Sequence, residues 1–181
     1  MHERRFHGDI NRLRSPERVA RMEVGRVVTL CLQDAPTAHT VLDIGTGSAL
    51  FAEEFAKRGL QVSGVDASPE MVAAARRYVP SGDFRTGEAE HLPFADGAFD
   101  LAFMGVLLHE TDDRLLALRE AYRVASQRVM ILEWPYEVQE FGPGLEERLT
   151  EENLASLALE ARFKPPTSFR LKNLILYRLE K

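Results

Sequence analysis

The sequence predicts an α/β fold, in which helices lie on both faces of a mainly parallel sheet as a three-layer α/β/α sandwich. Short apolar runs rich in β-branched residues alternate with helical patterns, which is typical of βαβ units. A glycine-containing turn joins the first predicted strand directly to a helix. The last two predicted strands are separated only by Lys172 and Asn173, which is too short for a parallel crossover, so they form a hairpin.

The predicted strands lie at residues 41–44, 61–65, 83–86, 100–104, 127–132, 167–171 and 174–179. We expect helices at 16–32, 49–58, 69–78, from a cap at 111–113 to about 125, and at 151–162. Two of these helices begin with serine, proline and glutamate, at Ser15-Pro16-Glu17 and Ser68-Pro69-Glu70. The serine hydroxyl caps the helix, proline suits its first turn, and the acid faces the positive end of the helix dipole.

The length of 181 residues fits a single domain. We expect residues 1–35 to form an N-terminal helical arm and residues 36–181 to form the α/β core. Residues 1–26 hold seven arginines against four acids, so the arm is basic. It is either a solvated helix or a lid that contacts an anionic substrate, and in the second interpretation residues 1–15 form the lid through Arg4, Arg5, Phe6, Arg12 and Arg14.

Composition excludes several classes of protein. The formal charge of −5 argues against a nucleic-acid-binding module, which normally carries a basic face. No apolar run reaches the roughly 18 residues of a membrane span, and the charged start of the chain does not resemble a signal peptide. The single cysteine, Cys31, and the spacing of the histidines predict no metal site. We therefore expect a cytoplasmic enzyme, and a homodimer stays open as its assembly.

The turn after the first strand reads Asp43-Ile44-Gly45-Thr46-Gly47 and leads into a helix. Glycines allow a sharp turn and a close approach of a ligand to the backbone, at the sheet edge where α/β proteins bind ligands. A lone pair of glycines is also consistent with an ordinary tight turn. The second strand ends in Asp66, which can accept hydrogen bonds from both ribose hydroxyls of a nucleoside, or can simply cap the next helix. Together these features predict a nucleoside site.

The identity of the nucleoside depends on two positions. A dinucleotide-binding loop would have a third glycine at position 50, where this chain has Leu50, which argues against an NAD-dependent oxidoreductase. Asp43, at the end of the first strand, suits the ammonium group of an amino-acid moiety, directly or through water. These differences favour S-adenosyl-L-methionine over NAD.

The chain resembles the class I S-adenosylmethionine-dependent methyltransferases, in the methyltransferase type 11 branch that includes the ubiquinone/menaquinone methyltransferases. The resemblance covers about residues 41–136 and rests on VLDIGTG at 41–47, GVDASPEM at 64–71, GEAEHLPF at 87–94 and Phe99-Asp100. It implies a Rossmann-like, seven-stranded, mostly parallel sheet with an antiparallel C-terminal strand. It also implies a methyl transfer that converts S-adenosyl-L-methionine to S-adenosyl-L-homocysteine.

The resemblance implies the roles of several residues at this site. The glycine loop packs on the methionine and ribose portions, Asp66 binds the ribose, and Glu88 accepts from the adenine amino group. The complete set of implied cofactor-binding residues is Asp43, Gly45, Gly47, Asp66, Ala67, Met71, Glu88, Ala89 and Met104. One departure from the family pattern is Ala49, where relatives often have glycine, and alanine should be tolerated there if the local φ is negative.

The acceptor side carries fewer signals. In-line methyl transfer needs alignment and water exclusion, and needs a base only when the nucleophile arrives protonated. His109 follows the fourth strand and is the candidate base, or it packs at the next helix. Trp134 and Tyr136 follow the fifth strand and, with Arg14, either line the acceptor pocket or pack structurally. We predict a methyltransferase for an unidentified small molecule; the alternative is an S-adenosylmethionine-binding protein without catalytic activity.

Overall fold

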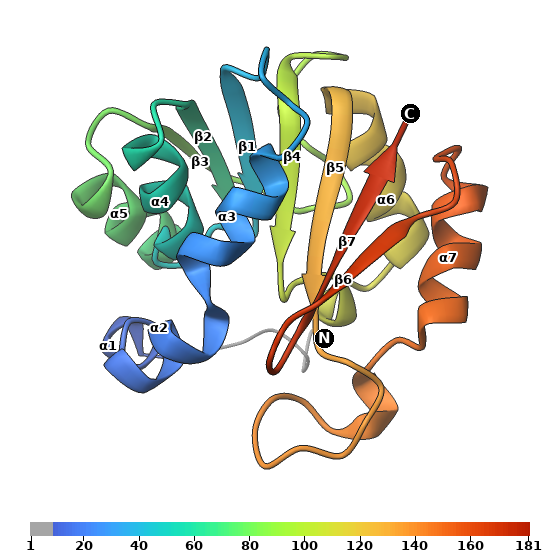
Figure 1. Cartoon of the computed structure of the whole chain (residues 1–181). Helices are drawn as coiled ribbons and strands as arrows, with labels where there is room; N and C mark the ends of the chain where they lie inside the picture. The colour runs from blue at the N-terminus through green and yellow to red at the C-terminus, as the bar shows by residue number, and fades with distance from the viewer. Residues whose placement is uncertain (1–8) are drawn as a thin grey trace.

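The computed structural model describes residues 9–181, so Arg4, Arg5 and Phe6 of the predicted lid lie outside the described residues. Its centre is a seven-stranded sheet in the order β3-β2-β1-β4-β5-β7-β6 (Figure 1). The strands are β1 Thr40–Ile44, β2 Gln61–Asp66, β3 Asp83–Thr86, β4 Phe99–Gly105, β5 Ala125–Glu133, β6 Thr167–Arg170 and β7 Ile175–Glu180. All seven predicted strands are confirmed, with ends that differ by up to two residues.

Strands β1 to β5 are parallel, and β7 pairs antiparallel with both β5 and β6. The hairpin predicted from the two-residue connection is therefore confirmed. β1 lies between β2 and β4. The strands up to β3 are therefore added on one side of β1, and the strands from β4 onward are added on the other side. Ligands of α/β proteins bind at such a switch point, outside the carboxyl ends of the strands.

The helices are α1 Ile10–Leu13, α2 Pro16–Met22, α3 Val24–Leu32, α4 Leu50–Lys57, α5 Pro69–Tyr78, α6 Arg114–Val124 and α7 Glu151–Glu160, with short 3₁₀ turns η1 Leu108–Glu110 and η2 Leu145–Glu147. One buried apolar cluster joins α3, α4 and α5 to one face of the sheet, and a second joins α6 and α7 to the other. The predicted three-layer sandwich is thus confirmed. Among the described residues, no helix has the length and apolar character needed to cross a bilayer.

The N-terminal arm differs from its prediction. The single helix expected at 16–32 is broken at Glu23, which adopts the left-handed conformation at φ 47° and separates α2 from α3. The residue at the break is neither glycine nor proline, so no local pattern predicts that the helix ends there. The break lets α1 and α2 turn to the carboxyl edge of the sheet, where Figure 1 also shows the long connection after β5.

Candidate functional site

A cavity of about 920 Å³ opens at the carboxyl edge of the sheet. Loops that follow β1, β2, β3, β4 and β5 line it, and residues of α1 and α2 close one side. The predicted residues that line this cavity are Asp43, Gly45, Gly47, Asp66, Ala67, Met71, Glu88, Ala89, His109 and Trp134. Residues from five separate segments of the predicted core therefore meet in one place.

Three predicted residues lie elsewhere. Met104 is fully buried in the cluster under α6, and the cavity is lined instead by the next residue, Gly105. Tyr136 is 52% exposed and lines a separate hollow of about 310 Å³. Arg14 is not among the residues that line the cavity, and its side chain is bound to the Ser48 carbonyl after the glycine loop and to Glu53 of α4.

The glycine loop is held by hydrogen bonds within the protein. The backbone N–H groups of Gly45 and Thr46 both donate to the Val65 carbonyl, at 2.8 and 2.9 Å. The Gly47 N–H donates to Asp66 Oδ2 at 2.8 Å, so the loop is attached to the end of β2. Gly45 and Gly47 have φ values of +70° and +52°, which explains why glycine suits both positions.

Ala49 does not meet the condition of a negative φ. Its φ is +59°, and it occupies the left-handed position just before α4 while its side chain is fully buried. The Ala49 N–H donates to the Thr46 carbonyl at 2.8 Å and closes a tight turn around Gly47 and Ser48, and the left-handed Ala49 leads from this turn into α4. The methyl group packs in the cluster with α3 and α4, which offsets part of the backbone strain.

Asp43 is a buried carboxylate beneath the loop. It is only 2% exposed and accepts a hydrogen bond from Thr46 Oγ1 at 2.9 Å. Burial raises the pKa of Asp43 to about 7, because the donors Thr46 and Ala52 only partly offset the desolvation of the charge and nearby Asp66 adds repulsion. A positive ligand group at this position would therefore stabilise the ionised form.

The arm is attached by Arg14 to the side of the cavity that the glycine loop and α4 form. Its guanidinium donates to the Ser48 carbonyl at 2.7 Å, forms an ion pair with Glu53, and stacks 3.6 Å over the ring of Tyr78. Leu13, Arg18 and Arg21 of the same arm line the cavity. The position of the arm thus depends on contacts with three elements of the core.

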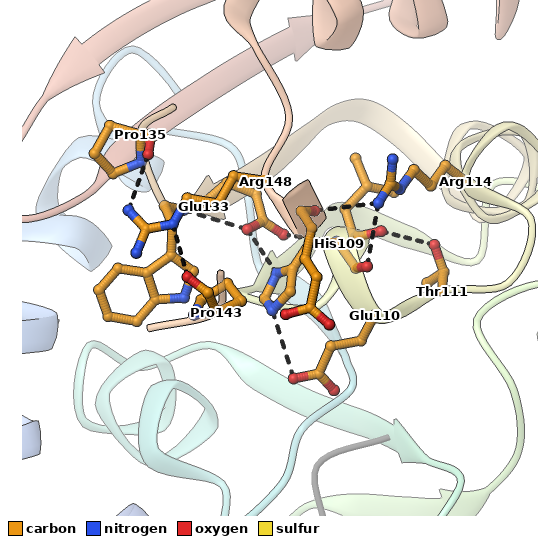
Figure 2. Close-up of polar contacts among 11 residues, drawn as sticks. His109, Glu110, Thr111, Arg114, Glu133, Pro135, Pro143 and Arg148 are labelled. Atoms are coloured by element: carbon orange, nitrogen blue, oxygen red, sulfur yellow. Dashed lines mark hydrogen bonds and ion pairs between the residues drawn. The ribbon is translucent and has the colours of Figure 1, made fainter. Parts of the chain in front are cut away.

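His109 forms a close pair with Glu133, which the sequence analysis did not single out. Figure 2 shows the ring between Glu133 and Glu110: Nδ1 lies 2.8 Å from Glu133 Oε2, and Nε2 lies 3.6 Å from Glu110 Oε1. Burial lowers the pKa of His109, but the neighbouring Glu133, Glu110 and Glu147 outweigh it, so the pKa is raised. Glu133 is the last residue of β5, which pairs with β4. An acidic residue at the end of a predicted strand is the signal in the sequence that could have identified it.

A second missed residue, Arg148, organises the connection after β5 (Figure 2). It is 6% exposed and donates to the carbonyls of Pro135, Glu137, Phe141 and Pro143 at 2.7–3.1 Å. Its guanidinium also lies 5.6 Å from the centre of the Trp134 ring. Nothing in the sequence predicts this role for an isolated arginine in a loop, because its acceptors are backbone carbonyls, which every residue carries.

No group of three histidine, cysteine or acidic residues that could hold a metal ion occurs within residues 9–181. The acids of the cavity are instead spread along the edge of the sheet, one or more to a strand. This distribution suits an extended organic ligand with several polar groups.

Comparison with known proteins identifies the core. The family described as "Methyltransferase domain" matches residues 42–132. The chain is 39% identical over 85 residues to a demethylmenaquinone methyltransferase of Chlorobaculum parvum, a match that covers 46% of this chain and 35% of that protein. It is 35% identical over 92 residues to a malonyl-[acyl-carrier protein] O-methyltransferase of Erwinia billingiae, covering 51% of this chain and 37% of the relative. The match thus spans well under half the length of these two curated relatives.

The whole fold also matches a solved structure. A SAM-dependent methyltransferase from Aquifex aeolicus superposes with a TM-score of 0.79 at 24% identity, over 94% of this chain and 95% of that one. At this identity the similarity establishes the fold, and the family match over residues 42–132 establishes the relationship. The chain therefore belongs to the methyltransferase-domain family, of the class I, S-adenosylmethionine-dependent type.

Proposed function

We propose that this protein transfers a methyl group from S-adenosylmethionine to a small-molecule acceptor. The observation that carries the proposal is how the glycine loop uses its amides. The N–H groups of Gly45, Thr46 and Gly47 all donate to acceptors within the protein. A dinucleotide site needs loop amides directed at a pyrophosphate, so this loop suits a ligand without phosphate.

The charges around the loop support the same choice. Asp43, Asp66 and Glu88 lie at or just beyond the ends of β1, β2 and β3, and all three line the cavity. Carboxylates beside the loop disfavour an anion and favour a cation. We assign Asp43 to the ammonium group, Asp66 to the ribose hydroxyls and Glu88 to the adenine amino group.

The chain contributes position and shielding to the transfer. Bound S-adenosylmethionine supplies a methyl group on a positively charged sulfur, which is already activated for displacement. The protein has to align the acceptor with that carbon and exclude water. We propose that α1 and α2 cover the cavity as the arm, and that Trp134 forms part of the acceptor wall.

Binding measurements test the donor. Isothermal titration with S-adenosylmethionine, S-adenosylhomocysteine and NAD should give binding of the first two only. Saturation at about 100 times the dissociation constant should add roughly 2.7 kcal/mol and raise the melting temperature by about 5–10 °C. Binding of NAD alone would contradict the proposal. A radiolabelled methyl-transfer screen then separates a methyltransferase from a protein that only binds the donor.

Further properties stay predictions. We propose that residues 36–181 form the catalytic core, and that the acceptor is not a nucleic acid, since the net charge is −5. A cytoplasmic location and a homodimer are predictions that fractionation and light scattering can check.

A further inference from the structure

A carboxylate holds a histidine by two bonds at the end of neighbouring strands β4 and β5. Glu133 Oε2 lies 2.8 Å from His109 Nδ1, and Glu133 Oε1 accepts the backbone N–H of His109 at 3.2 Å. The two side chains are only 6% and 4% exposed. Because one carboxylate binds both the ring and the backbone of the same residue, the orientation of the ring is fixed.

The proton on the ring is located by the same contact. A carboxylate can only accept a hydrogen bond, so Nδ1 carries the proton and Nε2 is the nitrogen with a free lone pair in the neutral ring. Glu110 Oε1, at 3.6 Å from Nε2, lies beyond hydrogen-bond distance and supplies charge rather than a donor. His109 and Glu110 both line the cavity, and Nε2 is the ring nitrogen on the side away from Glu133.

The charges that face the ring come from four elements. They are Glu133 of β5, Glu110 of η1, Glu147 of η2 and, at the His109 carbonyl, Arg114 of α6 at 3.3 Å. The three acids outweigh burial and raise the pKa of His109. They therefore stabilise the imidazolium that forms when Nε2 accepts a proton.

We infer that His109 Nε2 is the general base of the reaction, that Glu133 is its positioning residue, and that the acceptor carries a phenolic or enolic hydroxyl. This inference rests on the proposed function. The hydroxyl proton goes to Nε2, and the electron pair that it leaves makes the acceptor nucleophilic at oxygen or at the conjugated carbon. That atom forms a bond to the methyl carbon as the carbon–sulfur bond breaks, with its electron pair going to sulfur.

The class of hydroxyl follows from acidity and from the walls of the cavity. A phenol, with a pKa of about 10, gives up its proton to an imidazole base far more readily than a hydroxyl as weakly acidic as water, about 15.7. Trp134 and Phe141 line the cavity with ring centres 5.9 Å apart, and the Arg21 guanidinium stacks 3.9 Å over Phe141. Aromatic side chains with a cation beside them suit a planar ring that becomes anionic.

Imidazole NMR tests the pair without any turnover. In ¹H–¹⁵N spectra that correlate ring nitrogens with carbon-bound protons, the signal lost in His109→Asn identifies His109. We expect the Nδ1–H tautomer in the wild type. Glu133→Gln should lower the pKa of His109 and weaken that tautomer preference, while Glu110→Gln should lower the pKa and keep the tautomer. An Nε2–H tautomer in the wild type, or an unchanged titration in Glu133→Gln, would overturn the pairing.

Kinetics test the base. His109→Asn should lower the rate of methyl transfer by about 10²–10⁴-fold and leave the affinity for S-adenosylhomocysteine within about threefold. In Glu133→Gln the acid limb of the pH–rate profile should move to lower pH, which a merely structural role would not cause. Glu160→Gln, on the exposed end of α7, is the matched control. A wild-type rate in His109→Asn would overturn the assignment.

A panel of acceptors tests the substrate class. Radiolabelled S-adenosylmethionine is offered with 1-naphthol, catechol and 4-hydroxycoumarin, and with benzylamine and benzyl alcohol. We expect transfer to at least one of the first three and to neither of the last two. Transfer only to the amine or the alcohol, or to none of the five while S-adenosylhomocysteine binds, would overturn the acceptor class. Failure of S-adenosylhomocysteine to bind would instead contradict the proposed function.

Discussion

The Asp66 carboxylate holds the glycine loop through the backbone of Gly47. Oδ2 accepts the Gly47 N–H at 2.8 Å, and Oδ1 accepts the Ser68 N–H at 2.9 Å, so the acid links the loop after β1 to the start of α5. A carboxylate offers about four acceptor positions, and these two bonds use one on each oxygen. The residue that we assign to the ligand therefore also shapes the loop that receives it.

Asp66→Asn should weaken S-adenosylhomocysteine binding by about 10–100-fold. The amide keeps the size of the side chain but loses the charge, and hydrogen bonds to a charged group contribute about 1.5–3 kcal/mol. Isothermal titration measures the affinity, and urea unfolding measures the accompanying loss of loop stability. Asp83→Asn, on the exposed edge strand β3, is the matched control. Equal affinities of wild type and Asp66→Asn would remove Asp66 from the ligand site.

The stability of the protein should depend on pH through Asp43. Its pKa is about 7 in the folded state against 3.8 for an ordinary aspartate, so the folded state binds the proton more tightly. This stabilisation is fully present below pH 3.8 and is lost as the pH rises through about 7. Relative to wild type, Asp43→Asn should gain about 1–3 kcal/mol between pH 5 and pH 8, measured by urea unfolding at each pH.

Asp100→Asn is the control for this measurement. Its hydrogen bonds to His39, Thr40 and Gln127 outweigh burial and lower its pKa below the ordinary value, so it does not titrate between pH 5 and pH 8. Its unfolding free energy should therefore stay parallel to that of the wild type over this range. His109 titrates in the wild type and in both variants, so its contribution to the pH dependence cancels when each variant is compared with the wild type. A flat difference for Asp43→Asn would show that Asp43 is ionised before ligand binds.

Most of the fold was predictable because it depends on local signals. The strands, the capped helix starts at Ser15 and Ser68 and the hairpin at Lys172-Asn173 each follow from a pattern of a few residues. The break at Glu23 and the positive φ of Ala49 were not predictable, since long-range packing imposes a conformation that the local residues do not favour. Arg14 faces the core for the same reason: its partners lie 34 and 39 residues away.

Gly45 and Gly47 should respond differently to alanine. Both have positive φ, so each substitution costs about 1–2 kcal/mol of backbone strain. A Cβ at Gly45 would also lie 2.7 Å from a terminal carbon of Leu107, whereas a Cβ at Gly47 would have 3.7 Å to Leu13. Urea unfolding should therefore show Gly45→Ala to be the less stable variant. Equal losses would mean that Leu107 moves aside without cost.

Arg14→Met should loosen the arm. The variant keeps an apolar stem but loses the hydrogen bond to the Ser48 carbonyl, the ion pair with Glu53 and the stacking on Tyr78. We expect faster hydrogen exchange in residues 10–22 and a fall of about 1–2 kcal/mol in the unfolding free energy. Arg26→Met, whose side chain is 57% exposed, is the control. Unchanged exchange in 10–22 would show that other contacts hold the arm.

Arg148→Lys should disorder the connection after β5 while the donor side stays intact. Lysine has no planar fork, so it cannot bind the carbonyls of residues 135–143 together, and some of these buried acceptors lose their donor. We expect a loss of about 2–3 kcal/mol, faster hydrogen exchange in 135–147, and a shift in the emission of Trp134, the single tryptophan. Arg170→Lys is the control, because Arg170 reaches the same segment through a half-exposed ion pair with Glu137 that contributes little. S-adenosylhomocysteine affinity should not change in either variant, since the acids assigned to it lie at β1, β2 and β3. A large loss of that affinity in Arg148→Lys would mean that the connection also shapes the donor side of the cavity.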